Sequence, residues 1–307
     1  MLNRFIPALL LGFIHLLFIV WIVFPLFGWW SLLGLLVLPG YYFSPLQIAQ
    51  PSKSTIINVL SFGFGLVATF FLQNQFEVSN VLSASIVGVL GGVLFFRSGN
   101  ENLKIIPAAI YAGAFAGMSD LAKFHDPASI VLVSLIGGLI LELLKNSFNG
   151  IGGKLGSIGF GAVIIWVFFN SEPSQEINFP PFHLISLMFT VLIGFIGVLI
   201  TFYISNKKIG PVLASAISSL LISIPLEFYD FNGYAVVISA VFMGGTFVGM
   251  SSKKHFNWGV IMLAGLIFGT LFYFLTLNFG GFGGTLGTTA CLSCLLVLPL
   301  NKLRKTL

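Results

Sequence analysis

Apolar stretches, most of them near the length that crosses a lipid bilayer, recur along almost the whole of this chain. We count twelve, at residues 5–27, 31–43, 56–72, 81–96, 105–119, 128–146, 155–169, 184–204, 211–226, 235–251, 257–277 and 286–300. A transmembrane helix needs about 20 predominantly apolar residues. Hydrophobic residues make up 57% of the sequence and charged residues 7%, too few to cover a water-soluble protein of this length. The sequence therefore predicts an all-α polytopic membrane protein with about twelve transmembrane helices.

A glycine-rich motif occurs twice in the chain, 132 residues apart. Residues 113–120 read GAFAGMSD and residues 245–252 read GTFVGMSS, with five identical positions. A second motif repeats at an offset of 131, because residues 150–157 read GIGGKLGS and residues 281–288 read GFGGTLGT. Two motifs that repeat at nearly the same offset indicate an internal duplication.

This duplication divides the chain into three parts. An N-terminal two-helix segment, 1–50, precedes one repeat of five spans at 51–180 and a second at 181–307. Because five is an odd number, the second repeat must enter the membrane from the opposite side. If the N-terminus is cytoplasmic, thirteen of the fourteen Lys and Arg residues lie in cytoplasmic loops and only Lys123 lies outside. We therefore expect two inverted five-helix repeats in a plasma membrane, the inner membrane of a bacterium, with both termini cytoplasmic.

Short or broken helices are expected at the glycine motifs. The span at 105–119 would be roughly 22 Å long, whereas the hydrocarbon core is about 30 Å thick. A break in a membrane helix leaves backbone groups unpaired, so it is tolerated only where protein or a polar cavity covers it. In transporters built from inverted repeats, such breaks form the substrate site near the middle of the membrane.

The topology predicts that the third span of each repeat ends beside the glycine loop of the other repeat. This gives two groups of candidate substrate- or ion-binding residues: Ser119, Asp120, Gly283, Gly284, Thr285 and Thr288 towards the outside, and Gly152, Gly153, Lys154, Ser157, Ser251 and Ser252 towards the inside. Ser157 and Thr288 are expected to cap the helices that follow the loops. The free N–H groups of those helices would favour anions or carbonyl-type acceptors.

Several of these residues have a second interpretation. The glycines of the motifs also suit close packing of membrane helices. Asp120 is either a functional buried carboxylate or a charge in the outer headgroup zone, and Lys154 is either directed at a solute or an ordinary loop charge. His15, inside the first span, is expected to be a packing histidine with satisfied nitrogens, with a proton relay as the alternative.

The sequence contains no signature of an enzyme, and we expect neither a cofactor nor a bound metal. The net charge of +5 does not indicate nucleic-acid binding, because the basic residues lie in short loops between apolar spans. The five-plus-five plan is similar to the urea-transporter-like, sodium-coupled amino-acid-transporter-like and bicarbonate-transporter-like folds, an architectural analogy that fixes no substrate.

We therefore expect a secondary transporter or channel that moves a small polar solute, an anion being one candidate, through a midplane site between the repeats. The expected partners are the lipid bilayer and a small-molecule or ion substrate, and assembly into a homo-oligomer is left open. The alternative is a membrane-embedded binding or assembly subunit without transport activity.

Overall fold

The computed structural model describes residues 2–18, 33–45, 54–95, 103, 105–120, 123–124, 126–170, 183–207, 209–229, 234–275 and 281–303. This part of the chain contains twelve helices and no strand. The helices are α1 Leu2–Phe18, α3 Leu33–Phe43, α4 Ser54–Phe76, α5 Asn80–Phe95, α6 Ile106–Gly117, α7 Pro127–Leu144, α8 Lys154–Asn170, α9 Leu184–Ser205, α10 Pro211–Phe228, α11 Ala235–Gly249, α12 Trp258–Leu275 and α13 Thr285–Leu303.

Five of the helices are long and apolar enough to cross a membrane, namely α4, α7, α9, α10 and α12. The helices that end in the first glycine motif are shorter, with 12 residues in α6 and 15 in α11. Large apolar side chains such as Phe64 on α4 and Ile185 on α9 are exposed on the surface of the protein. Long apolar helices and an apolar exterior indicate a membrane-embedded helical protein.

Only part of the expected span at 5–27 falls within the described residues. In the structure α1 ends at Phe18, and residues 19–32 lie outside the described residues. The other helices begin and end within three or four residues of the expected spans. Differences of this size reflect fraying and capping at helix ends, which hydropathy does not detect.

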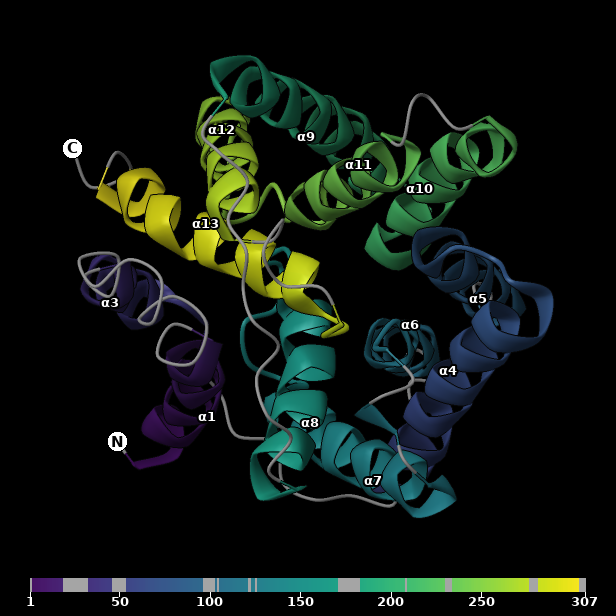
Figure 1. Cartoon of the computed structure of the whole chain (residues 1–307). Helices are drawn as coiled ribbons and strands as arrows, with labels where there is room; N and C mark the ends of the chain where they lie inside the picture. Colours follow the sequence, from purple (N-terminus) through teal and green to yellow (C-terminus); the bar gives the residue numbers. More distant parts are fainter. Residues whose placement is uncertain are drawn as a thin grey trace.

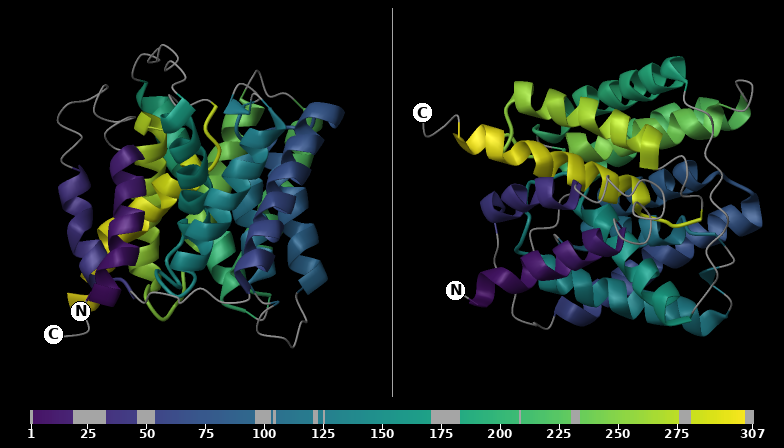
Figure 2. Two further views of the ribbon diagram at one scale, coloured as in Figure 1. Left: turned by 90° about the horizontal axis from the view of Figure 1, so that it is seen from below. Right: turned by 60° about the vertical axis from the view of Figure 1, so that its left-hand side comes forward.

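The helices α8 and α13 cross the middle of the molecule between two groups of helices (Figure 1). One group contains α4, α6 and α7, and the other contains α9, α11 and α12, while α5 packs beside α10 at the side away from α1 and α3. Seen from the side, α1 begins and α13 ends at the same end of the helical body (Figure 2, left). We call this end the terminal end.

Glycines allow the helices of each group to approach closely. A Cβ added at Gly113 of α6 would collide with a backbone carbonyl of α4, and a Cβ at Gly245 of α11 would collide with a backbone carbonyl of α9. The helices α8 and α13 cross at Gly156 and Gly287, where each residue has the other's backbone beside it. Contacts this close require residues without a side chain, so these glycines serve helix packing.

The helices α1 and α3 pack against α8 and α13. Nε2 of the buried His15 in α1 lies 3.1 Å from Oγ of Ser157 in α8, and its Nδ1 contacts the hydroxyl group of Tyr41 in α3. In α3, Gly40 lies directly against the backbone of Leu295 in α13. Both ring nitrogens of His15 therefore have partners inside the protein, and His15 joins the N-terminal helices to α8.

Candidate functional site

The end of α6 is tied to the loop that precedes α13. Ser119 accepts a hydrogen bond through Oγ from the backbone N–H of Gly283, with an N–O distance of 2.8 Å. The backbone N–H of Asp120 donates to the carbonyl of Gly281 at 3.1 Å. We call these four residues the Ser119 clasp. It brings together three residues of the first candidate group, and Gly281 is an addition.

The end of α11 is tied in the same way to the loop that precedes α8. Oγ of Ser251 accepts a hydrogen bond from the backbone N–H of Gly152 at 3.0 Å, and the backbone N–H of Ser252 donates to the carbonyl of Gly150 at 3.0 Å. We call these four residues the Ser251 clasp. Oγ of Ser251 also lies 3.5 Å from Sγ of Cys294, a buried free thiol of α13.

The last glycine of each loop determines where the following helix begins. Gly153 has a φ angle of 79° and Gly284 one of 85°, in the left-handed region that favours glycine. A Cβ at Gly153 would collide with the carbonyl of Gly287 in α13, and a Cβ at Gly284 with that of Gly156 in α8. Both the backbone conformation and the space therefore require glycine, and α8 and α13 begin at the next residue.

The expectation that Ser157 and Thr288 cap these helices is wrong. The helices begin three residues earlier, at Lys154 and Thr285. The hydroxyl group of Ser157 donates to the carbonyl of Gly153 at 3.4 Å, and that of Thr288 donates to the carbonyl four residues before it at 3.1 Å. This is the bond that Ser and Thr form inside a helix, where the backbone N–H groups already have carbonyl partners.

Polar side chains from neighbouring helices complete the ends of α6 and α11. Nε2 of Gln73 donates to the carbonyl of Gly117 at 2.8 Å, and Oγ of Ser205 donates to the carbonyl of Gly249 at 3.0 Å. The last carbonyl groups of a helix have no partner within the helix, so these contacts satisfy groups that would otherwise be unpaired. Gln73 and Ser205 are not among the residues predicted from the sequence, although they lie 132 residues apart, at the offset of the first motif.

A cavity of about 950 Å³ extends from the terminal end towards the middle of the protein. Its lining includes the loop between α7 and α8, the segment after α11, Ile105 directly before α6, and Ala108 and Phe115 within α6. It lies at the terminal end because His255, which lines it, accepts a hydrogen bond from Asn301 in the last turns of α13. Ten residues of α6 correspond to about 15 Å, so the cavity follows most of that helix.

A smaller cavity of about 380 Å³ lies at the other end of α6. It is lined by the end of α4, the start of α5, and the residues that follow α6, including Ser119 and Asp120. Asp120 is exposed, and Glu77 is the second carboxylate in the lining. The larger cavity is lined by Lys and His side chains and by no Asp or Glu within the described residues. The two cavities therefore differ in the sign of their charge.

The aromatic side chains of the repeated motif line the larger cavity, and Phe115 lies four residues before Ser119, which lines the smaller cavity. The rings of Phe115 and Phe247 are 4.6 Å apart, measured between centroids, and both line the inner end of the larger cavity. Each side chain is only 1% exposed. Tyr111 lies beside them, with its ring 4.2 Å from that of Phe115. The two phenylalanines occupy identical positions of the two motifs, but this equivalence in the sequence did not predict a contact between them.

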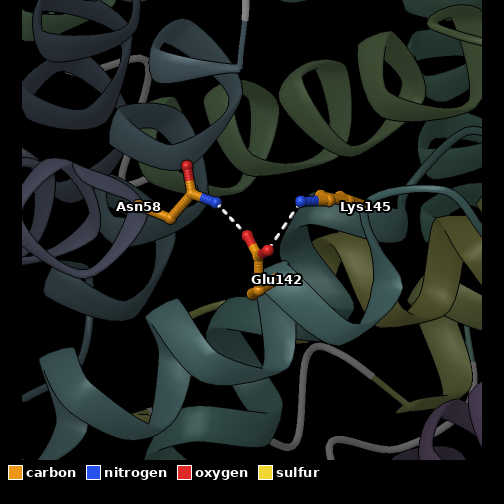
Figure 3. A network of polar contacts seen from close by, with 3 residues as sticks. All are labelled: Asn58, Glu142 and Lys145. Atoms are coloured by element: carbon orange, nitrogen blue, oxygen red, sulfur yellow. Dashed lines mark hydrogen bonds and ion pairs between the residues drawn. The ribbon is translucent and has the colours of Figure 1, made fainter. Parts of the chain in front are cut away.

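One of the lysines that line the larger cavity has a buried carboxylate partner. Oε1 of Glu142 lies 2.6 Å from Nζ of Lys145, and Oε2 of Glu142 accepts a hydrogen bond from Asn58 at 2.5 Å (Figure 3). Glu142 is 2% exposed, so the carboxylate is shielded from solvent, whereas the Lys145 side chain is partly exposed. The charge of Lys145 is largely compensated by this partner.

Lys154 holds the end of α7. Its Nζ donates to the carbonyl groups of Leu144 at 2.8 Å and Ser147 at 2.6 Å, and to Oδ1 of Asn149 at 3.0 Å. Basic side chains are favourable at the C-terminal end of a helix, where the carbonyl groups carry partial negative charge. The amino group of Lys154 is therefore held at the end of α7 rather than free to turn towards a solute.

Within the described residues no group of three or more His, Cys, Asp and Glu side chains is arranged to hold a metal ion. Compared with protein-family models, with curated proteins and with solved structures, the chain matches none of them.

Proposed function

We propose that this protein transports a small polar solute across a membrane, as a secondary transporter or a channel. The observation that carries the proposal is the larger cavity, which follows α6 to the aromatic pair and stops about one helical turn from the smaller cavity. Phe115 lines the larger cavity, and Ser119, four residues later, lines the smaller. A path through the protein would require only a local rearrangement at the end of α6.

We further propose that the chain consists of two inverted repeats, 51–180 and 181–307, after an N-terminal two-helix segment at 1–50. Matched contacts support this proposal. Each clasp joins the serine of one motif to a glycine of the loop in the other half of the chain. At the end of each motif helix, a side chain from the same position of the repeat binds the last carbonyl group, Gln73 at Gly117 and Ser205 at Gly249. The common location of the start of α1 and the end of α13 supports termini on the same side of the membrane, and the distribution of Lys and Arg residues favours the cytoplasmic side.

The basic lining of the larger cavity favours an anion among small polar solutes. The basic residues in the described lining are Lys145, Lys154, Lys254 and His255, of which Lys145 is paired with Glu142. A cavity lined by one sign of charge and enclosed by apolar helices raises the local concentration of oppositely charged solutes. Because the smaller cavity is lined by carboxylates, this preference applies to the terminal end.

The second hypothesis, a membrane-embedded binding or assembly subunit, predicts a packed interface between the halves. The larger cavity gives more support to transport, because it reaches the contact between the two motifs. No catalytic step forms part of the proposal.

Proteoliposomes that contain the purified protein provide the test. The flux of a panel of small anions, neutral polar solutes and cations is compared with that in protein-free liposomes. We expect Ala108→Trp, which places an indole in the larger cavity, to reduce the flux of the transported solute at least tenfold. The matched control is Leu192→Trp on the exposed face of α9. Flux of every solute at the protein-free rate, or equal flux in Ala108→Trp and the unaltered protein, would overturn the proposal.

A further inference from the structure

We infer that Phe115 and Phe247 together form the barrier that separates the two cavities and determines what crosses between them. This inference deepens the proposed function and rests on it, because a barrier matters only if a path exists. Neither side chain belongs to the candidate residues expected from the sequence. Their position at the inner end of the larger cavity assigns them this role.

The geometry leaves no space between the two rings. Their centroids are 4.6 Å apart and their planes are inclined by 55°, so the rings are in van der Waals contact. Each side chain is 1% exposed, although each lines the cavity. The rings thus present one small apolar face to the cavity and bury the rest. No solute passes between them unless at least one ring moves.

Tyr111 supports the pair from the side. Its ring lies 4.2 Å from that of Phe115 and 6.2 Å from that of Phe247, so it contacts both members. Its hydroxyl group lies 3.2 Å from Oγ of Ser215, which in turn lies 2.8 Å from Oγ1 of Thr246. Tyr111 is therefore fixed at both ends, by aromatic packing at its ring and by hydroxyl groups of α10 and α11 at its tip.

The two clasps hold the backbone of the barrier. A Cβ at Gly283 of the Ser119 clasp would collide with the carbonyl of Phe115, and a Cβ at Gly152 of the Ser251 clasp with the carbonyl of Phe247. Each phenylalanine therefore has its backbone against the loop of the opposite half and its ring against the other phenylalanine. Movement of either loop would shift one ring relative to the other.

An apolar barrier of this kind selects by hydration. A strongly hydrated ion loses much of its water shell beside two phenyl rings, which offer no replacement hydrogen bonds. The charged lining of the cavities attracts a solute, but the rings decide whether the solute can give up water. We therefore expect the barrier to favour weakly hydrated solutes over strongly hydrated ions of equal charge.

Cysteine accessibility tests the barrier without any knowledge of the solute. The variants are Asp120→Cys in the smaller cavity and Ser252→Cys in the larger, and both native cysteines are buried. A membrane-impermeant methanethiosulfonate reagent is added to one side of the membrane at a time. With the aromatic pair intact, we expect Asp120→Cys and Ser252→Cys to react from opposite sides only.

Replacing both phenylalanines with alanine should remove this sidedness. We expect Phe115→Ala/Phe247→Ala to make Asp120→Cys react at least tenfold faster from the side of the larger cavity. The matched control is Phe268→Ala, a fully buried phenylalanine of α12 that does not line either cavity. Reaction of Asp120→Cys from both sides with the pair intact, or unchanged sidedness in the double variant, would overturn the inference.

If the double alanine variant does not fold, Phe115→Leu/Phe247→Leu provides the second variant. Leucine keeps apolar bulk but removes the flat ring contact, so a smaller increase in the same reaction rate is expected, and an unchanged rate counts against the barrier. The two proposals fail separately. Loss of sidedness in the double alanine variant, together with no solute flux in proteoliposomes, would support the barrier and contradict transport. Solute flux that does not change when both phenylalanines are replaced would contradict the barrier alone.

Discussion

Oγ of Ser119 binds the backbone N–H of Gly283, a residue 164 positions later in the chain, at 2.8 Å. Oγ of Ser251 binds the backbone N–H of Gly152 at 3.0 Å, so the serine that follows the methionine in each motif holds the loop of the other half. The repeated motif is consequently a set of contacts rather than a single binding element. Its glycines pack against neighbouring helices, its phenylalanine meets the equivalent phenylalanine, and its serine joins the two halves.

Removal of either serine hydroxyl group should destabilise the protein measurably. Ser119→Ala and Ser251→Ala each leave a buried backbone N–H without its partner, which costs about 1–3 kcal/mol. The measurement is the apparent melting temperature in detergent, followed by size-exclusion chromatography of the heated samples. The control is Ser252→Ala, whose hydroxyl group accepts a hydrogen bond from the exposed backbone N–H of Lys254. An equal effect of all three substitutions would contradict the structural role of the clasps.

The glycines with left-handed backbones should be sensitive to alanine for two separable reasons. Gly153→Ala and Gly284→Ala combine an unfavourable φ angle, worth about 1–2 kcal/mol, with collisions against the backbone of the opposite helix. Gly210 has a similar φ angle of 82° but nothing within 4 Å of an added Cβ. We therefore expect Gly210→Ala to lower the apparent melting temperature much less than the other two. Equal losses would show that φ alone matters at these sites.

The positions of the helices and of the repeated motifs could be predicted from the sequence. The residues at which α8 and α13 begin, and the contact between the two phenylalanines, could not. Hydropathy locates apolar spans, and the repeat offset matches the equivalent residues of the two halves. The start of α8 is decided by Gly153 against α13, a contact between segments far apart in the chain. Equivalence of Phe115 and Phe247 likewise does not imply contact, because contact depends on how the two halves are placed relative to each other.

The hydrogen-bond partners of Lys154 likewise could not be predicted from the sequence. A lysine between two membrane spans follows from the loop pattern, and the sequence offered a solute-directed ammonium or an ordinary loop charge. Its carbonyl partners come from the residues around the end of α7, and the irregular turn there includes Phe148 with a φ angle of 58°. Such a turn has no signature in hydropathy or in the repeat, so the partners of Lys154 could not be predicted.

His15 should couple the N-terminal helices to α8. His15→Phe keeps an aromatic ring but removes the contacts with Ser157 and Tyr41, so we expect a loss of about 1–3 kcal/mol. His15→Phe and Ser157→Ala both break the same contact, between Nε2 of His15 and Oγ of Ser157. Their losses of stability should therefore be less than additive in the double variant. Phe13→Leu, at an exposed position of α1, is the control. Additive losses in the double variant would contradict the coupling.

The opposite charges of the two cavities should be visible in the rates of thiol modification. At Ser252→Cys, in the basic larger cavity, an anionic methanethiosulfonate reagent should react several-fold faster than a cationic one, relative to their rates with a free thiol. A single charge at about 10 Å and an effective dielectric constant of about 40 changes a local concentration about fourfold. At Asn74→Cys, beside Glu77 in the smaller cavity, the preference should reverse.

Two adjacent lysines provide the matched pair for this prediction. Lys254 lines the larger cavity, whereas Lys253 does not line it and lies 5.9 Å from the ring of Trp258. Lys254→Gln should therefore reduce the anion preference at Ser252→Cys more than Lys253→Gln does, although both remove one positive charge. The preference should also weaken as ionic strength rises, because salt screens charges that are accessible to solvent. Equal effects of the two lysines would show that net charge, and not the lining of the cavity, sets the preference.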